Sequence, residues 1–155
     1  MLFRSRYTGE QICADPSPWH RLACRYDERT DRGRVLLLDA AHTAQSVEKL
    51  MDYAGRRYGS FSVLFAALSD KDIAGMLKAM AVGKGLEQLY AVDLYDPRAF
   101  VACEVLERWQ GLSAKPATLV PEAAISTIPE CDDPLVVCGS FRLLSAFMRA
   151  RGLRP

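Results

Sequence analysis

Short apolar runs alternate along this chain with stretches in which apolar residues recur every three or four positions. Short uninterrupted apolar runs favour strands that are buried on both faces of a sheet. We predict such strands at 35–38, 61–68, 89–92, 118–120 and 135–138. The segment 22–26 alternates apolar and polar residues, which predicts a further strand at an edge of the sheet, where an antiparallel direction is allowed.

Helical periodicity fills the intervals between these runs. One helix is predicted to reach about Tyr58, where Gly59 ends it, and a second to open at Asp72. Pro97 suits the first turn of a third helix, residues 122–127 a short helix, and the last helix follows residue 140. Strand and helix repeated four or five times predict an α/β fold: a Rossmann-like, mostly parallel sheet of about six strands with helices on both faces.

Length and composition bound the answer further. The 155 residues suit one domain. We expect residues 1–20 to be irregular, because prolines interrupt them, and residues 21–155 to form the domain; 27–33 is charged and turn-like. The net charge of +1, with acids and bases interspersed, argues against nucleic-acid binding by a basic face. No apolar run approaches the ~20 residues of a membrane span, and no apolar stretch follows the basic start, so we expect neither membrane insertion nor a signal peptide.

Missing motifs exclude several kinds of site. The five cysteines are odd in number and lack C-x-x-C spacing, which suggests neither a zinc site nor a disulfide framework; we predict no metal ligands and a reducing cytoplasm. The sequence contains neither G-x-x-x-x-G-K-[ST] nor G-x-G-x-x-G. The phosphate cradles of P-loop and dinucleotide-binding domains are therefore not encoded here.

Polar residues follow the predicted strands at their carboxyl ends. Ligands of open α/β sheets bind beyond these ends, so the side chains there are the candidates for a site. They are Asp39, His42 and Thr43 after the first run, Ser69, Asp70 and Lys71 after the second, Arg98 after the third, and Gly139 and Ser140 after the last. We predict that all four groups share one edge.

The chemistry of these candidates suits a small zwitterion with an extra carboxylate. Gly139 and Ser140 open a helix and offer N–H groups to an anion. Arg98 can bind a carboxylate through two parallel N–H bonds. The imidazole ring of His42 can donate or accept a hydrogen bond. Asp39 can hold an amine or orient His42.

Each candidate also has a purely structural alternative, and these alternatives stay open at this point. Helix capping accounts equally well for several of the polar residues, since Asp, Ser and Thr are preferred there. Lys71 suits a solvated surface position, and Arg98 can pair with Glu122 or another surface acid. The capping candidates are Asp39, Thr43, Asp70, Asp72 and Ser140.

Four segments carry recognisable motifs in a fixed order. They read L-L-D-A-A-H-T at 37–43, A-L-S-D-K-D-I at 67–73, D-P-R-A at 96–99 and V-V-C-G-S at 136–140. In the same order they resemble the D-x-A-H-N-P, A-L-S-D-K-D, D-x-P-R-A and V-x-C-G-S segments of folylpolyglutamate and dihydrofolate synthases. The related Mur ligases share the fold, and some carry A-H-T, but S-D-K-D and C-G-S favour the folate enzymes.

The resemblance implies that 21–155 is the C-terminal, Mur ligase-type domain of such an enzyme. A separate N-terminal P-loop domain then binds ATP and magnesium, a folate or pteroate carboxylate is activated as an acyl phosphate, and L-glutamate attacks it. The resemblance gives Asp39 and His42 a catalytic role and places Thr43, Arg98, Gly139 and Ser140 at the amino acid, with Ser69, Asp70 and Lys71 nearby. This chain alone is expected to bind no cofactor and to be inactive.

Departures from the family pattern leave two alternatives. Thr43 and Ala44 stand where the family has Asn and Pro, and the P-G-R segment that opens the domain is not intact around 17–22. One alternative is a stand-alone, non-catalytic binding or regulatory module with the same fold. The other is the C-terminal domain of a Mur-type ligase that adds a different amino acid.

Overall fold

Six strands form a single sheet in the order β1-β2-β6-β3-β4-β5 in the computed structural model, which describes residues 24–128 and 132–154. All neighbouring strands are parallel except β1 and β2. This confirms the predicted α/β class, with five parallel strands and one antiparallel edge strand. The strands are β1 (Asp27–Asp31), β2 (Arg34–Leu38), β3 (Phe61–Phe65), β4 (Leu86–Asp93), β5 (Ala117–Pro121) and β6 (Leu135–Cys138).

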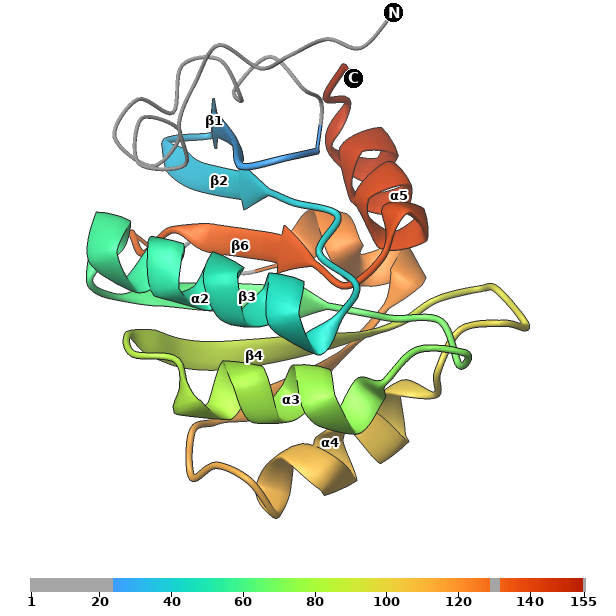
Figure 1. Cartoon of the computed structure of the whole chain (residues 1–155). Coiled ribbons are helices and arrows are strands. Elements are labelled where there is room, and N and C mark those ends of the chain that lie inside the picture. Colours follow the sequence, from blue (N-terminus) through green and yellow to red (C-terminus); the bar gives the residue numbers. More distant parts are fainter. Residues whose placement is uncertain (1–23, 129–131, 155) are drawn as a thin grey trace, which may run out of the picture.

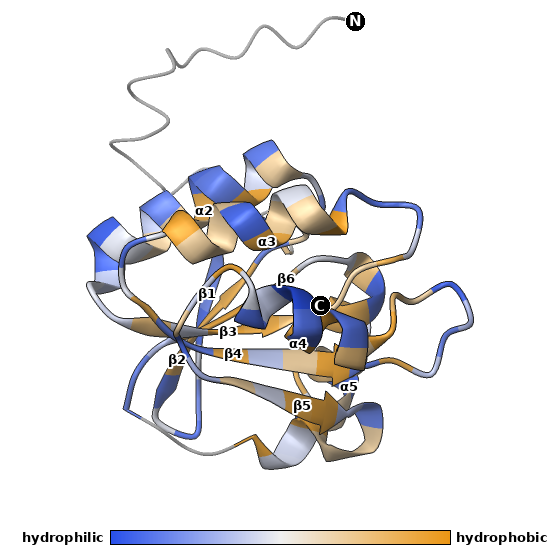
Figure 2. Ribbon diagram, turned by 90° about the horizontal axis from the view of Figure 1, so that it is seen from below, coloured by the Kyte–Doolittle hydropathy of each residue, from blue (hydrophilic) through white to orange (hydrophobic). Residues whose placement is uncertain are grey.

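Helices cover both faces of this sheet (Figure 1). They are α2 (Ala44–Tyr58), α3 (Ile73–Val82), α4 (Ala102–Gln110), the 3-10 helix η1 (Glu122–Thr127) and α5 (Phe141–Arg151). One buried cluster joins α2, α3 and α4 to one face, and a second joins α5 and η1 to the other. Figure 2 shows the apolar strands between these layers and polar residues on the outer turns of α2 and α3.

Strand periodicity explains how one sheet serves two cores. Along β2, Leu37 belongs to the cluster under α2 and α3, whereas Leu36 and Leu38 belong to the cluster under α5. Successive strand side chains point to opposite faces, so every position of a central strand is buried. The predicted uninterrupted apolar runs follow directly from this requirement.

The predicted edge strand is present and antiparallel, but it lies at Asp27–Asp31 and not at the predicted 22–26. Within the described residues, Cys24 and Tyr26 have positive φ values of 64° and 45°, which interrupt a strand, and pairing begins only at Asp27. A tight turn at Arg32 and Gly33, with φ of 50° and 81°, joins β1 to β2 as a hairpin. The charged segment 27–31 forms this strand because an edge strand exposes one side to solvent. Residues 1–23 lie outside the described part, and they include the whole of the predicted irregular segment 1–20.

The start of the third helix also differs from the prediction. Pro97 lies in a tight turn in which the Ala99 N–H donates to the Asp96 carbonyl at 2.9 Å. The chain then pairs with the loop after β3, because the Phe100 N–H donates to the carbonyl of Ala67 at 2.8 Å. This non-local bond holds the backbone extended, and α4 begins at Ala102. In the described part of the chain, no helix has the length and apolar character that a membrane span needs.

Candidate functional site

Four loops meet at the carboxyl edge of the sheet, as the strand order requires. After β2 and β6, the Gly139 N–H donates to the Ala41 carbonyl at 2.9 Å. After β3 and β4, the Ser69 N–H donates to the Arg98 carbonyl at 2.8 Å. Hydrogen bonds thus join these loops in two neighbouring pairs along one edge.

Three helices begin at this edge, each with a side-chain cap. Thr43 accepts from Ser46 N in a capping box on α2, Asp72 accepts from Gly75 N on α3, and Ser140 accepts from Leu143 N on α5. The capping alternatives for these three residues are therefore confirmed. The first turns of α2 and α3 lie in contact, since a Cβ on Gly75 would stand 3.0 Å from the Cβ of Ala44. Helix starts favour anions, so the edge carries a partial positive charge from the backbone.

The side chain of Asp39 shapes the loop after β2 from inside the protein. Asp39 is only 3% exposed, and its carboxylate accepts hydrogen bonds from the N–H groups of Tyr26 and Ala41, both at 2.8 Å. Burial raises the pKa of this carboxyl above its ordinary value, although the two backbone bonds act in the opposite direction. Asp39 fixes the backbone course between β2 and His42.

The ring of His42 is oriented by the backbone and not by Asp39. Its Nδ1 lies 2.8 Å from the Ala40 carbonyl oxygen, which can only accept, so Nδ1 carries the proton of the neutral ring. The other nitrogen, Nε2, then has a lone pair with no hydrogen-bond partner among the described residues. A partly exposed ring in this tautomer can accept a proton or a hydrogen bond from an amine.

Gly139 allows the loops after β3 and β6 to approach closely. Its φ is 112°, and a Cβ there would lie 2.3 Å from the carbonyl oxygen of Ala66 and 2.8 Å from the ring of Phe65. The preceding residue, Cys138, is buried, and burial raises the pKa of its thiol, as does the nearby charge of Asp39. The thiol therefore stays protonated and packs as a small apolar group.

Arg98 pairs with Asp96 and not with Glu122. Its Nε and Nη2 donate to the two carboxylate oxygens of Asp96 at 3.2 and 3.1 Å, and the Arg98 side chain is 74% exposed. Glu122 instead accepts from Arg142 at 2.8 Å. Sequence reasoning placed Asp96 at this edge, within the D-P-R-A segment, but gave neither Asp96 nor Arg142 a role.

The loop after β3 exposes the remaining candidates. Lys71 Nζ pairs with the carboxylate of Asp70 at 3.2 Å, and Ser69 and Asp70 are exposed. Asp70 does not cap α3, because Asp72 occupies that position. These three side chains lie on the same edge but make no described side-chain contact with His42 or Ser140.

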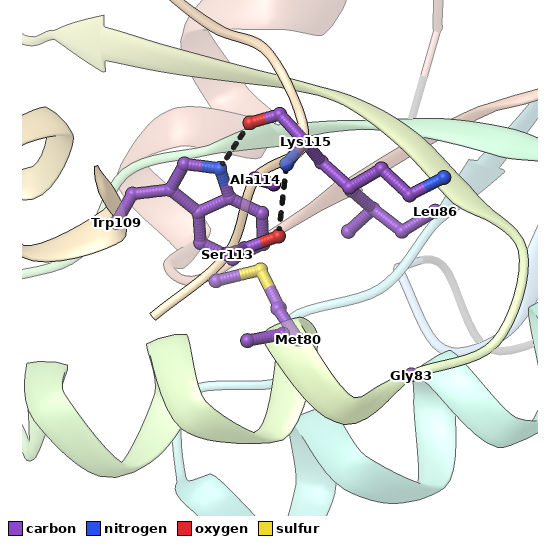
Figure 3. A pocket seen from close by; sticks show the side chains of 8 residues that line it. Met80, Gly83, Leu86, Trp109, Ser113, Ala114 and Lys115 are labelled. Carbon is purple, nitrogen blue, oxygen red and sulfur yellow. Dashed lines mark hydrogen bonds between the residues drawn. The ribbon is translucent and has the colours of Figure 1, made fainter. Parts of the chain in front are cut away.

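Two hollows in the surface have none of the candidate residues in their lining. One is lined by Met80, Trp109 and Lys115 among others, and Figure 3 shows the hydrogen bonds that join Trp109 and Ser113 to the backbone of Lys115. The Trp109 Nε1–H donates to the Lys115 carbonyl at 2.9 Å, and the Lys115 ammonium pairs with Glu87 at 3.1 Å. The second hollow lies along β4, β5 and η1. Within residues 24–128 and 132–154, no group of three or more His, Cys, Asp or Glu side chains could hold a metal ion.

Comparisons with known proteins point in one direction. No model of a protein family matches the chain, and no curated protein matches it. Solved structures do match. The ligand-free bifunctional folylpolyglutamate synthase/dihydrofolate synthase of Yersinia pestis is 27% identical with a TM-score of 0.70, and the match covers 85% of this chain and 32% of that one.

Two further solved structures agree with this match. The same Yersinia pestis enzyme with Mn, AMPPNP and L-glutamate bound is 26% identical, with a TM-score of 0.68 and the same coverage of 85% and 32%. Folylpolyglutamate synthase of Thermotoga maritima, at 17% identity, shares the fold with a TM-score of 0.72 over 83% of this chain and 30% of that one. This chain spans about a third of the length of these enzymes. It is therefore similar over most of its length to folylpolyglutamate synthase/dihydrofolate synthase, and its fold and extent fit the C-terminal domain of that enzyme.

Proposed function

We propose that this chain supplies the L-glutamate-binding side of the active site of an ATP-dependent ligase of the folylpolyglutamate/dihydrofolate synthase type. The observation that carries the proposal is the carboxyl edge itself, where three capped helix starts adjoin the Nε2 of His42, which no described residue hydrogen-bonds. Helix starts attract carboxylates, and a ring nitrogen with a lone pair attracts an amine. An amino acid presents both groups.

His42 and Ser140 receive direct roles in this proposal. Nε2 of His42 accepts a hydrogen bond from the glutamate amine and takes its proton as the amine nitrogen attacks the acyl phosphate. The N–C bond forms, the C–O bond to the phosphate breaks, and inorganic phosphate leaves. The oxygen of Ser140 accepts from Leu143 N, which leaves its hydroxyl proton to donate to a glutamate carboxylate.

Asp39, Gly139 and Thr43 position these groups, and Arg98 supplies a cation. Asp39 holds the backbone before His42, and Thr43 holds the helix start after it. Gly139 brings Ser140 beside the loop of His42. The exposed guanidinium of Arg98 attracts a carboxylate at the β4 end of the edge, and Lys71 adds charge at the β3 end.

Two exposed aromatic side chains at the same edge favour a contact with another protein domain there. Tyr95 is 70% exposed in the loop after β4, and Phe141 is 58% exposed at the start of α5. Single exposed aromatics are common, but these two lie beside the proposed glutamate site. We assign them to contacts with a P-loop domain that binds ATP and magnesium and presents the acyl phosphate, so that this chain alone catalyses nothing.

Binding of L-glutamate tests this function directly. A titration followed by backbone amide NMR should shift the signals of 40–43 and 139–143, and His42→Ala should weaken the affinity about tenfold, as expected for a lost hydrogen bond to a charged group. Lys49→Ala, an exposed change in the middle of α2, serves as the matched control and should bind like wild type. Equal affinity of wild type and His42→Ala, or no response to L-glutamate, would refute the proposal.

Activity assays address the dependence on a partner domain. The chain with ATP, magnesium, L-glutamate and a dihydropteroate should release no phosphate above the rate without protein. Turnover by the isolated chain would contradict the assignment of the acyl phosphate to a separate domain.

A further inference from the structure

The guanidinium of Arg98 is held along one edge, and the structure describes no hydrogen bond to its other edge within 24–128 and 132–154. Its Nε and Nη2 bond to the Asp96 carboxylate, and its own backbone N–H donates to the same carboxylate at 2.9 Å. A guanidinium has a second pair of parallel donors, one N–H of Nη1 and the remaining N–H of Nη2, and neither of these two N–H groups has a hydrogen-bond partner in the described residues. The side chain of Asp96 is only 10% exposed, whereas that of Arg98 is 74% exposed. Asp96 thus fixes Arg98 from the protein side.

Arg142 ties this pair to the start of α5. Its Nη2 donates to both carboxylate oxygens of Glu122, at 2.8 and 3.0 Å, and its Nε lies 3.9 Å from Asp96. Glu122 in turn accepts from the Tyr95 N–H at 2.6 Å. In the loop after β4, Glu122 therefore holds the backbone at Tyr95 and Asp96 holds it at Arg98, and Arg142 contacts both acids. The neighbouring arginines keep the pKa of Asp96 below its ordinary value, so its carboxylate stays charged.

The place of Arg142 in the sequence is unfavourable for a helix by itself. It is the second residue of α5, and a positive charge in a first turn is repelled by the helix dipole. The two carboxylates offset this repulsion. Arg142 therefore does not stabilise α5, and its position is explained by its contacts with Asp96 and Glu122.

We propose that Asp96 and Arg142 are positioning residues that hold the guanidinium of Arg98 with its Nη1/Nη2 edge toward a ligand carboxylate. The identity of that ligand as L-glutamate rests on the function proposed above, but the positioning itself does not. Arg142 is two residues from Ser140, so its contacts with Asp96 and Glu122 connect the loop after β4 to the start of α5.

Side-chain NMR relaxation of Arg98 Nε tests the positioning without any ligand. In wild type this N–H should be ordered on the nanosecond timescale, and in Arg142→Met it should approach the mobility of a free surface arginine. Arg142→Lys should restore part of the order, since it keeps the charge. Arg56→Met is the matched control: Arg56 is 73% exposed and pairs with Asp52 within α2. Equal order of Arg98 in wild type and Arg142→Met overturns the proposal.

Titrations with L-glutamate and its two monoamides test what the positioned group recognises. One monoamide, L-glutamine or L-isoglutamine, should bind wild type about tenfold more weakly than L-glutamate, the scale expected for a lost charge-assisted pair. Arg98→Met should abolish this discrimination and Arg142→Met should reduce it. Unchanged discrimination in both variants overturns the ligand role. Failure of wild type to bind L-glutamate refutes the proposed function instead, and the relaxation data still decide the positioning.

Discussion

Replacing Gly139 by alanine tests whether close backbone approach builds the carboxyl edge. The glycine has a φ of 112°, and its N–H donates to Ala41 across the two loops that carry His42 and Ser140. An added methyl group would meet the carbonyl oxygen of Ala66 at 2.3 Å and the Phe65 ring at 2.8 Å. Neither can step aside cheaply, because one is backbone and the other is a fully buried ring.

Two costs set the magnitude. A positive φ costs an alanine about 1–2 kcal/mol relative to glycine, and forcing a methyl group into a packed site costs about 1–3 kcal/mol. Together they predict a loss of roughly 2–5 kcal/mol in the free energy of unfolding. A domain of this kind has only about 5–15 kcal/mol in total, so the melting temperature should fall by roughly 5–15 °C.

Urea unfolding followed by circular dichroism measures this loss, and Gly152→Ala separates the two costs. Gly152 also has a positive φ, 65°, but nothing lies within 4 Å of a Cβ there. It should lose only the conformational part, about 1 kcal/mol. Equal losses for the two variants would show that Gly139 is not sterically confined. Gly139→Ala should also shift the amide signals of the His42 loop, and an unchanged spectrum would argue against the contact.

Three further predictions concern single side chains. Burial raises the pKa of Asp39 above its ordinary value, so the folded protein keeps this proton to higher pH than the unfolded chain. The free energy of unfolding of wild type, measured with urea, should therefore fall as pH rises through the raised pKa, and Asp39→Asn should not show this fall. Parallel pH profiles of wild type and Asp39→Asn would contradict the prediction. Thr43→Ala should cost about 1 kcal/mol of stability through the lost cap, and Thr43→Asn, the family residue, should cost almost nothing in the same assay. Arg34 is buried and pairs with Asp133 at 3.2 Å. Arg34→Met should therefore lower the free energy of unfolding by about 2 kcal/mol, and Arg34→Lys should lower it less. Equal losses for the two variants would contradict a role of the ion pair in stability.

Local chemistry let the sequence alone predict much of this protein. The order of strands and helices follows from hydrophobic periodicity, and the caps at Thr43, Asp72 and Ser140 follow from residue type at helix starts. The sharing of one edge by four loops follows from the direction of parallel strands. Each of these features depends on neighbours in the chain or on a general rule of the fold.

Only the tertiary structure decided which partners the polar side chains take. It turned the charged segment 27–31 into a strand, since pairing with β2 supplies its hydrogen bonds. In the folded protein Arg98 pairs with Asp96, and Glu122 pairs with Arg142. The Asp39 carboxylate accepts from the N–H of Tyr26 and makes no bond to His42. These pairings depend on distances between segments that are remote in sequence. A polar side chain bonds to whichever complementary group the packed core brings within reach, and no local sequence pattern encodes that distance.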